Sequence, residues 1–302
     1  MGGGASLRRW VESVREFVRV TDREHGRKAH LPELEVTGGC QLRCTRCLSS
    51  SSPQGTHGTM TRTDWCNVII DAADLGVSRI QLIGGEPTLY PHWVDLVELA
   101  LTLGRQVEVY SNLYKVLPAA WDVFERPGVL LATSYYSDDP AEHDAITTQP
   151  GSHARTRANI AEAVRRGIPI RAGIVNIQPG QRVAEARADL VSLGVKHIQT
   201  DRVRAVGRAA KGTMTPSVNE LCGRCGDRRA AVLPNGDLTL CVLSRFMPVL
   251  NVRSRSLGNI LGGSEWRAAV ARIPARASVP CQPDDTNDCD PSRTEACDPA
   301  YD

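Results

Sequence analysis

Three cysteines lie close together in the first fifth of the 302-residue chain. Cys40, Cys44 and Cys47 follow the spacing Cys-x3-Cys-x2-Cys within the stretch TGGCQLRCTRCLSS. Thiolates bind soft metals, and a closed zinc site or a fully ligated [4Fe–4S] cluster takes four ligands. Three cysteines therefore either belong to a zinc site with a distant fourth ligand or hold a [4Fe–4S] cluster with one iron left open.

Two short polar motifs follow, each directly after an apolar run. The first motif consists of Gly84, Gly85, Glu86 and Pro87. Glycines allow the backbone to approach a ligand closely, and a carboxylate accepts a strong hydrogen bond from an ammonium group. The second motif, Ser111-Asn112, places short polar side chains suited to ribose hydroxyls after the run at 107–110.

The order and spacing of these three motifs resemble the radical S-adenosylmethionine (SAM) enzymes. The resemblance implies that Cys40, Cys44 and Cys47 hold a [4Fe–4S] cluster whose open iron binds the amino and carboxylate groups of SAM. It also implies that Glu86 accepts from the SAM ammonium group and that Ser111 and Asn112 face the ribose. The expected cofactors are this cluster and SAM.

Short apolar runs alternate with segments of helical periodicity from residue 33 onward. Strands are predicted at 33–37, 79–83, 106–110, 129–136, 168–175 and 197–203. Helices are predicted at 62–75, 91–103, 115–125, 152–166 and 182–193. Such alternation indicates an α/β fold with parallel strands. The resemblance implies an open partial (βα)6 barrel, with the three motifs at the carboxyl ends of the first three strands.

Polar residues on the later strands extend the resemblance. Ser134, on the fourth strand, is a candidate SAM contact. The pairs at 143–144 (His-Asp) and 151–152 (Gly-Ser) resemble a loop of peptide-modifying members, but the arginine that often follows His-Asp is missing. The candidate substitutes are Arg155, Arg157 and Arg171. The residue before the third cysteine, usually aromatic in the family, is Arg46, and the fifth strand lacks a full G-x-I-x-G-x-x-E pattern.

A second group of six cysteines occupies the C-terminal part: Cys222, Cys225, Cys241, Cys281, Cys289 and Cys297. Pro234-Asn235-Gly236-Asp237 predicts a hairpin turn between strands at 231–233 and 238–240, which would hold Cys225 and Cys241 at a defined separation. The pattern resembles the SPASM and twitch extensions, which imply one or two auxiliary [4Fe–4S] clusters. A zinc ribbon is the alternative, and the number of clusters stays open.

Three regions are therefore expected. Residues 1–30 form an amphipathic helical extension, 31–208 the radical SAM barrel and 209–302 a small cysteine-rich auxiliary cluster domain. Cys66, on a predicted helix, is expected to be a buried structural thiol. His57 is a loop histidine that could face substrate.

Composition narrows the class of partner. Hydrophobic content of 41% and a net charge of +2 are typical of a soluble globular protein with no nucleic-acid partner. Because the sequence contains no membrane-spanning stretch and no signal-peptide core, we expect a reducing cytoplasm, where clustered thiolates bind metal. The acidic end, 281–302, carries seven carboxylates against one arginine.

The resemblance leads to one main functional hypothesis. A 5′-deoxyadenosyl radical generated from SAM would abstract hydrogen from a ribosomally made precursor peptide and lead to a crosslink, thioether, epimer or dehydrogenated residue. The alternatives are a twitch-type oxidoreductase acting on a small sugar or cyclitol and a non-catalytic iron–sulfur sensor. An enzyme of either kind needs an electron donor such as ferredoxin or flavodoxin, and no acid or base residue can be named.

Overall fold

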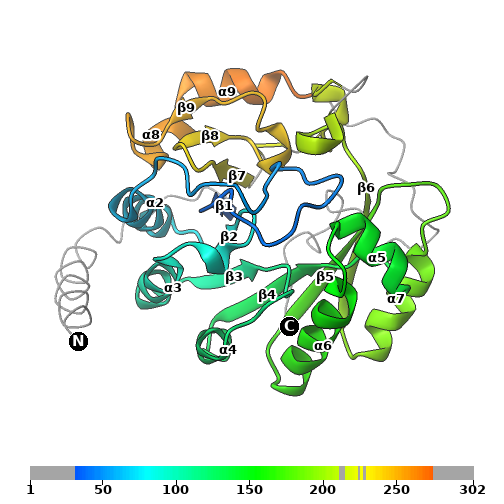
Figure 1. Ribbon diagram of the computed structural model, residues 1–302. Coiled ribbons are helices and arrows are strands. Elements are labelled where there is room, and N and C mark those ends of the chain that lie inside the picture. Colours follow the sequence, from blue (N-terminus) through cyan, green and yellow to red (C-terminus); the bar gives the residue numbers. More distant parts are fainter. Residues whose placement is uncertain (1–30, 211–214, 224, 227–228, 275–302) are drawn as a thin grey trace.

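The computed structural model describes residues 31–210, 215–223, 225–226 and 229–274 (Figure 1). The expected helix within 1–30 and the cysteines at 281, 289 and 297 lie outside these residues. None of the helices in the described part is both long and apolar enough to cross a bilayer.

Nine strands form one sheet in the order β6-β5-β4-β3-β2-β1-β7-β8-β9. The first six are β1 (Leu31–Glu35), β2 (Arg79–Ile83), β3 (Gln106–Tyr110), β4 (Val129–Ser134), β5 (Ile170–Asn176) and β6 (His197–Arg202). Each of the strands β1 to β5 pairs in parallel with the next along the chain. The predicted α/β fold with six parallel strands in an open sheet is confirmed.

Helices connect these strands and lie along the outer side of the curved sheet (Figure 1). They are α2 (Arg62–Asp74), α3 (Trp93–Thr102), α4 (Pro118–Phe124), α5 (Pro140–Thr147), α6 (Ser152–Arg165) and α7 (Val183–Ser192). Helix α5 was not predicted, although Asp139 caps its first turn and Pro140 occupies its first position. Both are helix-start signals, but the segment has only eight residues and weak apolar periodicity.

The strands have one apolar and one polar face. Leu34, Leu82 and Val109 are fully buried within the hydrophobic core that includes residues of the helices. The alternate residues Glu33, Gln81 and Glu108 stand in one row across β1, β2 and β3. Because successive side chains of a strand point to opposite faces, this row belongs to the inner side of the sheet.

The C-terminal part continues the same sheet. Strand β7 (Arg229–Val232) pairs in parallel with β1, and β8 (Asp237–Thr239) and β9 (Leu250–Asn251) follow in antiparallel pairing. The hairpin predicted around residues 234–237 is therefore confirmed. Helices α8 (Leu257–Leu261) and α9 (Ser264–Ala271) lie at this end (Figure 1). The sheet is not interrupted at residue 208, and a separate auxiliary domain stays a prediction.

Candidate functional site

A cavity of about 380 Å³ opens at the carboxyl ends of the parallel strands. All three cysteines of the first motif line it, and so do five of the expected cofactor contacts: Gly84, Gly85, Asn112, Ser134 and Arg171. These residues come from five different strand–helix repeats, so the topology brings together what the sequence keeps up to 131 residues apart.

The loop that carries the cysteines, residues 36–60, is fixed from several sides. At its start, the Cys40 amide donates to the Ser52 carbonyl at 3.0 Å. In its middle, the Thr45 amide donates to the Ile146 carbonyl at the end of α5, at 2.9 Å. Around the second and third cysteines, Arg208 donates to two backbone carbonyls. Its Nε donates to the Cys44 carbonyl at 2.7 Å, and its backbone amide donates to the Cys47 carbonyl at 2.9 Å. The three thiols thus lie on a preorganised backbone.

Gly85 packs directly against this loop. Its amide donates to the Thr37 carbonyl at 2.7 Å, and a Cβ at this position would lie 2.2 Å from the Gly39 carbonyl oxygen. The next amide, that of Glu86, donates to the same Gly39 oxygen at 2.8 Å. Only glycine fits here, because any side chain would overlap the backbone next to Cys40.

Glu86 is buried behind the cavity wall and bonded to its neighbours, and its contact with SAM stays a prediction. Its side chain is 1% exposed and does not line the cavity. The carboxylate accepts four hydrogen bonds: from the amide and hydroxyl of Thr88, from the Ser111 hydroxyl and from the Asn112 amide. With its acceptor sites directed at these donors, Glu86 ties the Gly-Gly-Glu-Pro motif to the end of β3. The predicted contact with a SAM ammonium group does not follow from this geometry.

Ser111 and Pro87, two further expected cofactor contacts, lie beside Glu86. The Ser111 hydroxyl is buried against Glu86, and Pro87 begins a short 3-10 helix, η1 (Pro87–Leu89). Neither residue lines the cavity. Of the Ser-Asn pair, only Asn112 lines the cavity. The side-chain nitrogen Nδ2 of Asn112 donates to Cys40 Sγ at 3.4 Å and to Gln41 Oε1 at 3.1 Å.

Arg171 lines the cavity but is already paired. Its guanidinium group donates to both oxygens of Glu108, at 2.8 and 2.7 Å, and lies over the Tyr110 ring. Burial acts to raise the pKa of Glu108, but Arg171, Gln81 and Arg79 together outweigh it and hold the pKa below its usual value. The other two candidate arginines point elsewhere: Arg155 lies over Tyr114, and Arg157 forms a fork with Asp189.

The His-Asp and Gly-Ser pairs join two helices. The Asp144 carboxylate accepts from the Gly151 amide, the Ser152 hydroxyl and the His153 amide, and so caps the start of α6. His143 lines the cavity, as do Glu33, Glu35 and Tyr136. The sequence motifs did not indicate that these four residues line a cavity. The alternation Leu-Pro-Glu-Leu-Glu-Val at 31–36 is the signal that could have found the two glutamates.

The chemistry of the three thiols fits a metal cluster. Burial raises the pKa of both Cys40 and Cys44 to about 12, so these thiols are neutral at pH 7 unless a cation stabilises the thiolate. Among the described residues no three His, Cys, Asp or Glu side chains surround a single metal ion. A [4Fe–4S] cluster spreads its thiolates over separate irons, and three cysteines around one cavity wall suit that arrangement.

The three described members of the second cysteine group, Cys222, Cys225 and Cys241, are not among the residues that line the cavity. Cys225 Sγ and Cys241 Sγ lie 3.3 Å apart, and both residues are buried. A hydrogen bond with Cys222 is the largest contribution that raises the pKa of Cys225. Val242, directly after Cys241, lines the cavity, and its amide donates to Glu33 Oε2 at 3.0 Å.

Two isolated residues have structural roles. Cys66 is 3% exposed on α2, as predicted for a structural thiol. His57 is bonded to the Thr37 hydroxyl at 2.8 Å through Nδ1 and is not among the residues that line the cavity.

Comparison with known families decides the class. The family model described as Radical SAM superfamily matches residues 34–190. The chain belongs to this superfamily. Its members use a [4Fe–4S] cluster and SAM.

Individual relatives extend the similarity. A PqqA peptide cyclase from Ruegeria pomeroyi is 30% identical over 185 residues, which cover 59% of this chain and 48% of the relative. A PqqA peptide cyclase from Xanthomonas axonopodis pv. citri is 26% identical over 297 residues, 82% of this chain and 78% of the relative. The chain spans about half the length of the first of these relatives.

A solved structure shares the fold of this radical SAM chain. Streptococcus suis SuiB, in a crystal structure bound to the precursor peptide SuiA, superposes with a TM-score of 0.68 at 13% identity. The match covers 88% of this chain and 72% of that chain. At this identity the likeness shows a common fold that extends beyond the parallel strands.

Proposed function

We propose that the chain is a radical SAM enzyme that modifies a ribosomally made precursor peptide. The observation that carries the proposal is the single cavity lined by Cys40, Cys44 and Cys47 together with Gly84, Gly85, Asn112 and Ser134. The similarity to PqqA peptide cyclases over most of the chain supports a peptide as the substrate class.

The residues of the cavity divide into those for the cofactors and those for the substrate. Cys40, Cys44 and Cys47 would ligate the cluster, with Asn112 donating toward Cys40 Sγ. When bound, the cluster and SAM supply a 5′-deoxyadenosyl radical that abstracts hydrogen from carbon. The backbone at Gly84 and Gly85 and the Ser134 hydroxyl would hold SAM, because they line the cavity beside the cysteine loop.

The wall formed by β1 and β2 suits a peptide. The Glu35 carboxylate accepts two hydrogen bonds from the Arg245 guanidinium group, at 2.9 and 3.0 Å. Glu33, two residues earlier on β1, lies opposite Gln81 of β2. Buried amide and carboxyl groups can exchange hydrogen bonds with a peptide backbone, which carries one donor and one acceptor per residue. Burial raises the pKa of both Glu33 and Glu35, although Arg229 and Arg245, respectively, oppose the shift.

The second cysteine group is part of the proposal. Cys222, Cys225 and Cys241 would bind an auxiliary [4Fe–4S] cluster together with cysteines of the segment 281–297, in an auxiliary domain spanning 209–302. An electron donor such as ferredoxin or flavodoxin would reduce the SAM cluster. A reducing cytoplasm suits this chemistry, because all seven described cysteines are free thiols.

The test is anaerobic reconstitution with iron and sulfide, followed by reduction in the presence of SAM. We expect 5′-deoxyadenosine, and a mass change in a peptide encoded beside the gene of this protein. Deoxyadenosine without any modified peptide, but with conversion of a sugar or cyclitol, would replace the peptide with a small-molecule substrate. Incorporation of iron without formation of 5′-deoxyadenosine would indicate a non-catalytic binding or sensor protein.

A further inference from the structure

Arg208 holds its guanidinium group against the backbone of the cysteine loop. It belongs to η2 (Gly207–Ala210), a short 3-10 helix that follows β6. Its Nε donates to the Cys44 carbonyl at 2.7 Å, and its backbone amide donates to the Cys47 carbonyl at 2.9 Å. Both carbonyls belong to cysteines that would ligate the SAM cluster, so the positive charge of Arg208 lies beside that site.

The segment around Arg208 packs closely on the loop. At Gly207, where φ is +60°, a Cβ would lie 2.2 Å from the Leu48 carbonyl oxygen and 2.4 Å from the Cys47 carbonyl oxygen. Arg208 is half-buried, and its Nη2 atom is shielded from solvent. Because solvent and salt screen a shielded charge less than an exposed one, Arg208 exerts a strong field on the loop.

The positive charge of Arg208 has no counter-charge among the described residues. A guanidinium group stays protonated in proteins. Within the described part of the chain, Nη2 makes no hydrogen bond and no carboxylate pairs with this side chain. By contrast, Arg202 and Arg204 form ion pairs with Glu220 and Asp201, respectively. A shielded charge without a partner costs free energy, so a negative charge is expected beside Arg208.

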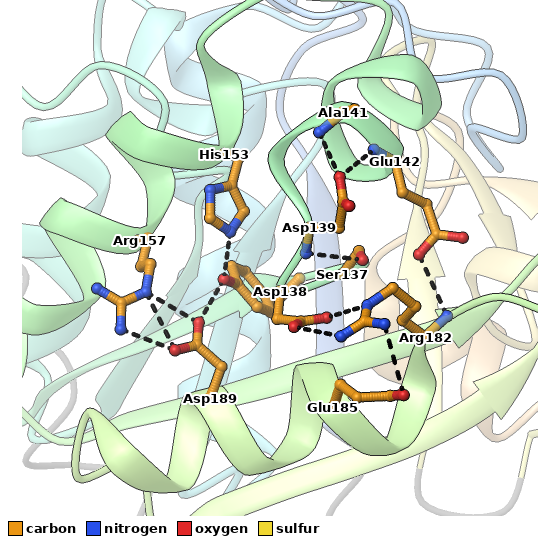
Figure 2. A network of polar contacts seen from close by, with 11 residues as sticks. Ser137, Asp138, Asp139, Ala141, Glu142, His153, Arg157, Arg182, Glu185 and Asp189 are labelled. Atoms are coloured by element: carbon orange, nitrogen blue, oxygen red, sulfur yellow. Dashed lines mark hydrogen bonds and ion pairs between the residues drawn. The ribbon is translucent and has the colours of Figure 1, made fainter.

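The carboxylates at the start of the neighbouring helix α5 are already occupied (Figure 2). The end of this helix is bonded to the cysteine loop. At its start, Arg182 binds both oxygens of Asp138, and Asp139 accepts from two amides of the first turn. These carboxylates are satisfied by their own partners and do not balance the charge of Arg208.

The thiols of the loop can supply the missing negative charge. Burial and the neighbouring thiols raise the pKa of Cys44 to about 12, and Arg208 opposes the shift. Burial also raises the pKa of Cys40 to about 12, and there the Glu86 carboxylate adds to the shift. A bound cluster keeps its cysteines as thiolates. Arg208 therefore lies on the side of Cys44, where it favours negative charge.

We propose that Arg208 supplies the counter-charge of the cluster bound by Cys40, Cys44 and Cys47 and thereby raises the reduction potential of that cluster. This inference rests on the proposed binding of a [4Fe–4S] cluster by these cysteines. Reduction by the electron donor adds a negative charge, which a fixed positive charge nearby stabilises. The field acts through space, so the shielded Nη2 atom needs no contact with a molecule in the cavity.

Two substitutions separate the charge of Arg208 from its hydrogen bond to the loop. Arg208→Gln retains an amide donor and removes the charge, whereas Arg208→Lys retains a positive charge. Arg253→Gln is the control, because Arg253 donates to the Thr59 carbonyl of the same loop but is exposed. The control therefore removes a bond to the loop together with a charge that solvent screens.

The measurement is the midpoint potential of the SAM cluster in the anaerobically reconstituted chain. A redox titration follows the electron paramagnetic resonance signal that changes when SAM is added. We expect Arg208→Gln to shift the one-electron equilibrium about tenfold toward the oxidised cluster, which lowers the potential by about 59 mV. Arg208→Lys and Arg253→Gln should stay near the wild-type potential. A wild-type potential in Arg208→Gln, or an equal shift in Arg208→Lys, would overturn the proposal.

Iron content and Tm reveal a purely structural role. If Arg208 only anchors the loop, both of its variants lose iron or Tm, while the clusters that form keep the wild-type potential. If Arg208→Gln assembles no cluster, the iron content decides. A cluster in Arg208→Lys alone supports the role of the charge, and loss of the cluster from both variants refutes it.

Failure of the proposed function shows separately. SAM cleavage by the unsubstituted chain without a modified peptide would refute the peptide as substrate, and the potentials of the variants would still decide the role of Arg208. An unsubstituted chain that binds no [4Fe–4S] cluster would overturn both proposals.

Discussion

The two cysteine groups of this chain differ in how completely the surrounding protein prepares them. Cys40, Cys44 and Cys47 lie on a loop whose backbone is bonded to residues before α2, at the end of α5 and after β6. In the second group, Cys225 and Cys241 are buried with their sulfur atoms 3.3 Å apart. Two cysteines that bind separate irons of one cluster need their sulfur atoms farther apart than this.

This difference indicates which of the two cysteine groups is positioned by protein packing and which is positioned by a bound metal. The first loop is held by contacts between elements of the barrel, so its geometry exists before a cluster binds. The second group rests on a short hairpin, and three of its six cysteines lie outside the described residues. We therefore expect removal of metal to alter the second region more than the first.

The largest effect is expected from the first group. Replacing Cys40, Cys44 and Cys47 together by Ala should remove about four irons per chain and abolish SAM cleavage, because these are the only cysteines among the described residues that line the cavity. Iron analysis measures the loss of the cluster, and chromatography of 5′-deoxyadenosine measures SAM cleavage. Deoxyadenosine formed by the triple variant would show that these cysteines do not hold the SAM cluster.

A smaller but severe effect is expected from the backbone that supports this loop. Gly85→Ala would place a Cβ 2.2 Å from the Gly39 oxygen and 2.9 Å from Cys40 Cβ, so the loop must move. We expect a loss of about 2–4 kcal/mol in unfolding free energy and reduced iron binding. Gly76→Ala is the control, because its added Cβ meets nothing within 4 Å although its φ is +73°. Equal stability of the two variants would contradict a close-packed contact at Gly85.

The second cysteine group should affect only the iron that is not part of the SAM cluster. The double substitution Cys225→Ala and Cys241→Ala should lower the iron content by about four, while the SAM cluster stays. SAM cleavage would then continue without modified peptide, if the auxiliary cluster takes part in product formation. Cys66→Ala, which removes a buried thiol outside both groups, is the control. Zinc instead of iron at this site would show a structural ribbon.

A moderate effect is expected at Glu86. Glu86→Gln replaces one acceptor oxygen by an NH2 group, which would then face at least one of the donors from Thr88, Ser111 and Asn112. Because two donors cannot bond to each other, we expect a loss of about 1–3 kcal/mol in folding stability. Denaturant unfolding measures it. A weaker SAM Kd with unchanged stability would instead support the predicted contact between Glu86 and the SAM ammonium group.

The smallest effect is a change in pH dependence at Glu33. Burial raises the pKa of this carboxyl above its value in the unfolded chain, so the folded state binds the proton more tightly. Its contribution to stability is present below the unfolded value of 4.5 and is lost as pH rises through the raised pKa. Relative to the wild type, Glu33→Gln should therefore gain stability as pH increases. A difference between the two proteins that does not vary with pH would contradict this.

Much of the fold could be predicted because its signals are local. The six parallel strands, most of the helices and the hairpin at 234–237 follow from apolar runs, helical periodicity and turn residues. Helix α5 was missed because its eight residues show little periodicity and only its capping residues mark it. The continuation of the sheet from β1 to β7 was also missed, because pairing between strands about 200 residues apart leaves no local pattern.

The sequence alone determined which residue types are available for chemistry and in what order. Cysteine spacing and the motifs at 84–87 and 111–112 are read along the chain, so they identify thiolates, glycines and polar side chains. Only the tertiary structure decided which way those side chains point. It placed Glu86 and Ser111 against each other, away from the cavity, and it placed His143 and Glu33 in the cavity wall. The physical reason is that direction depends on packing between elements distant in sequence, and these contacts determine which buried polar group finds a partner.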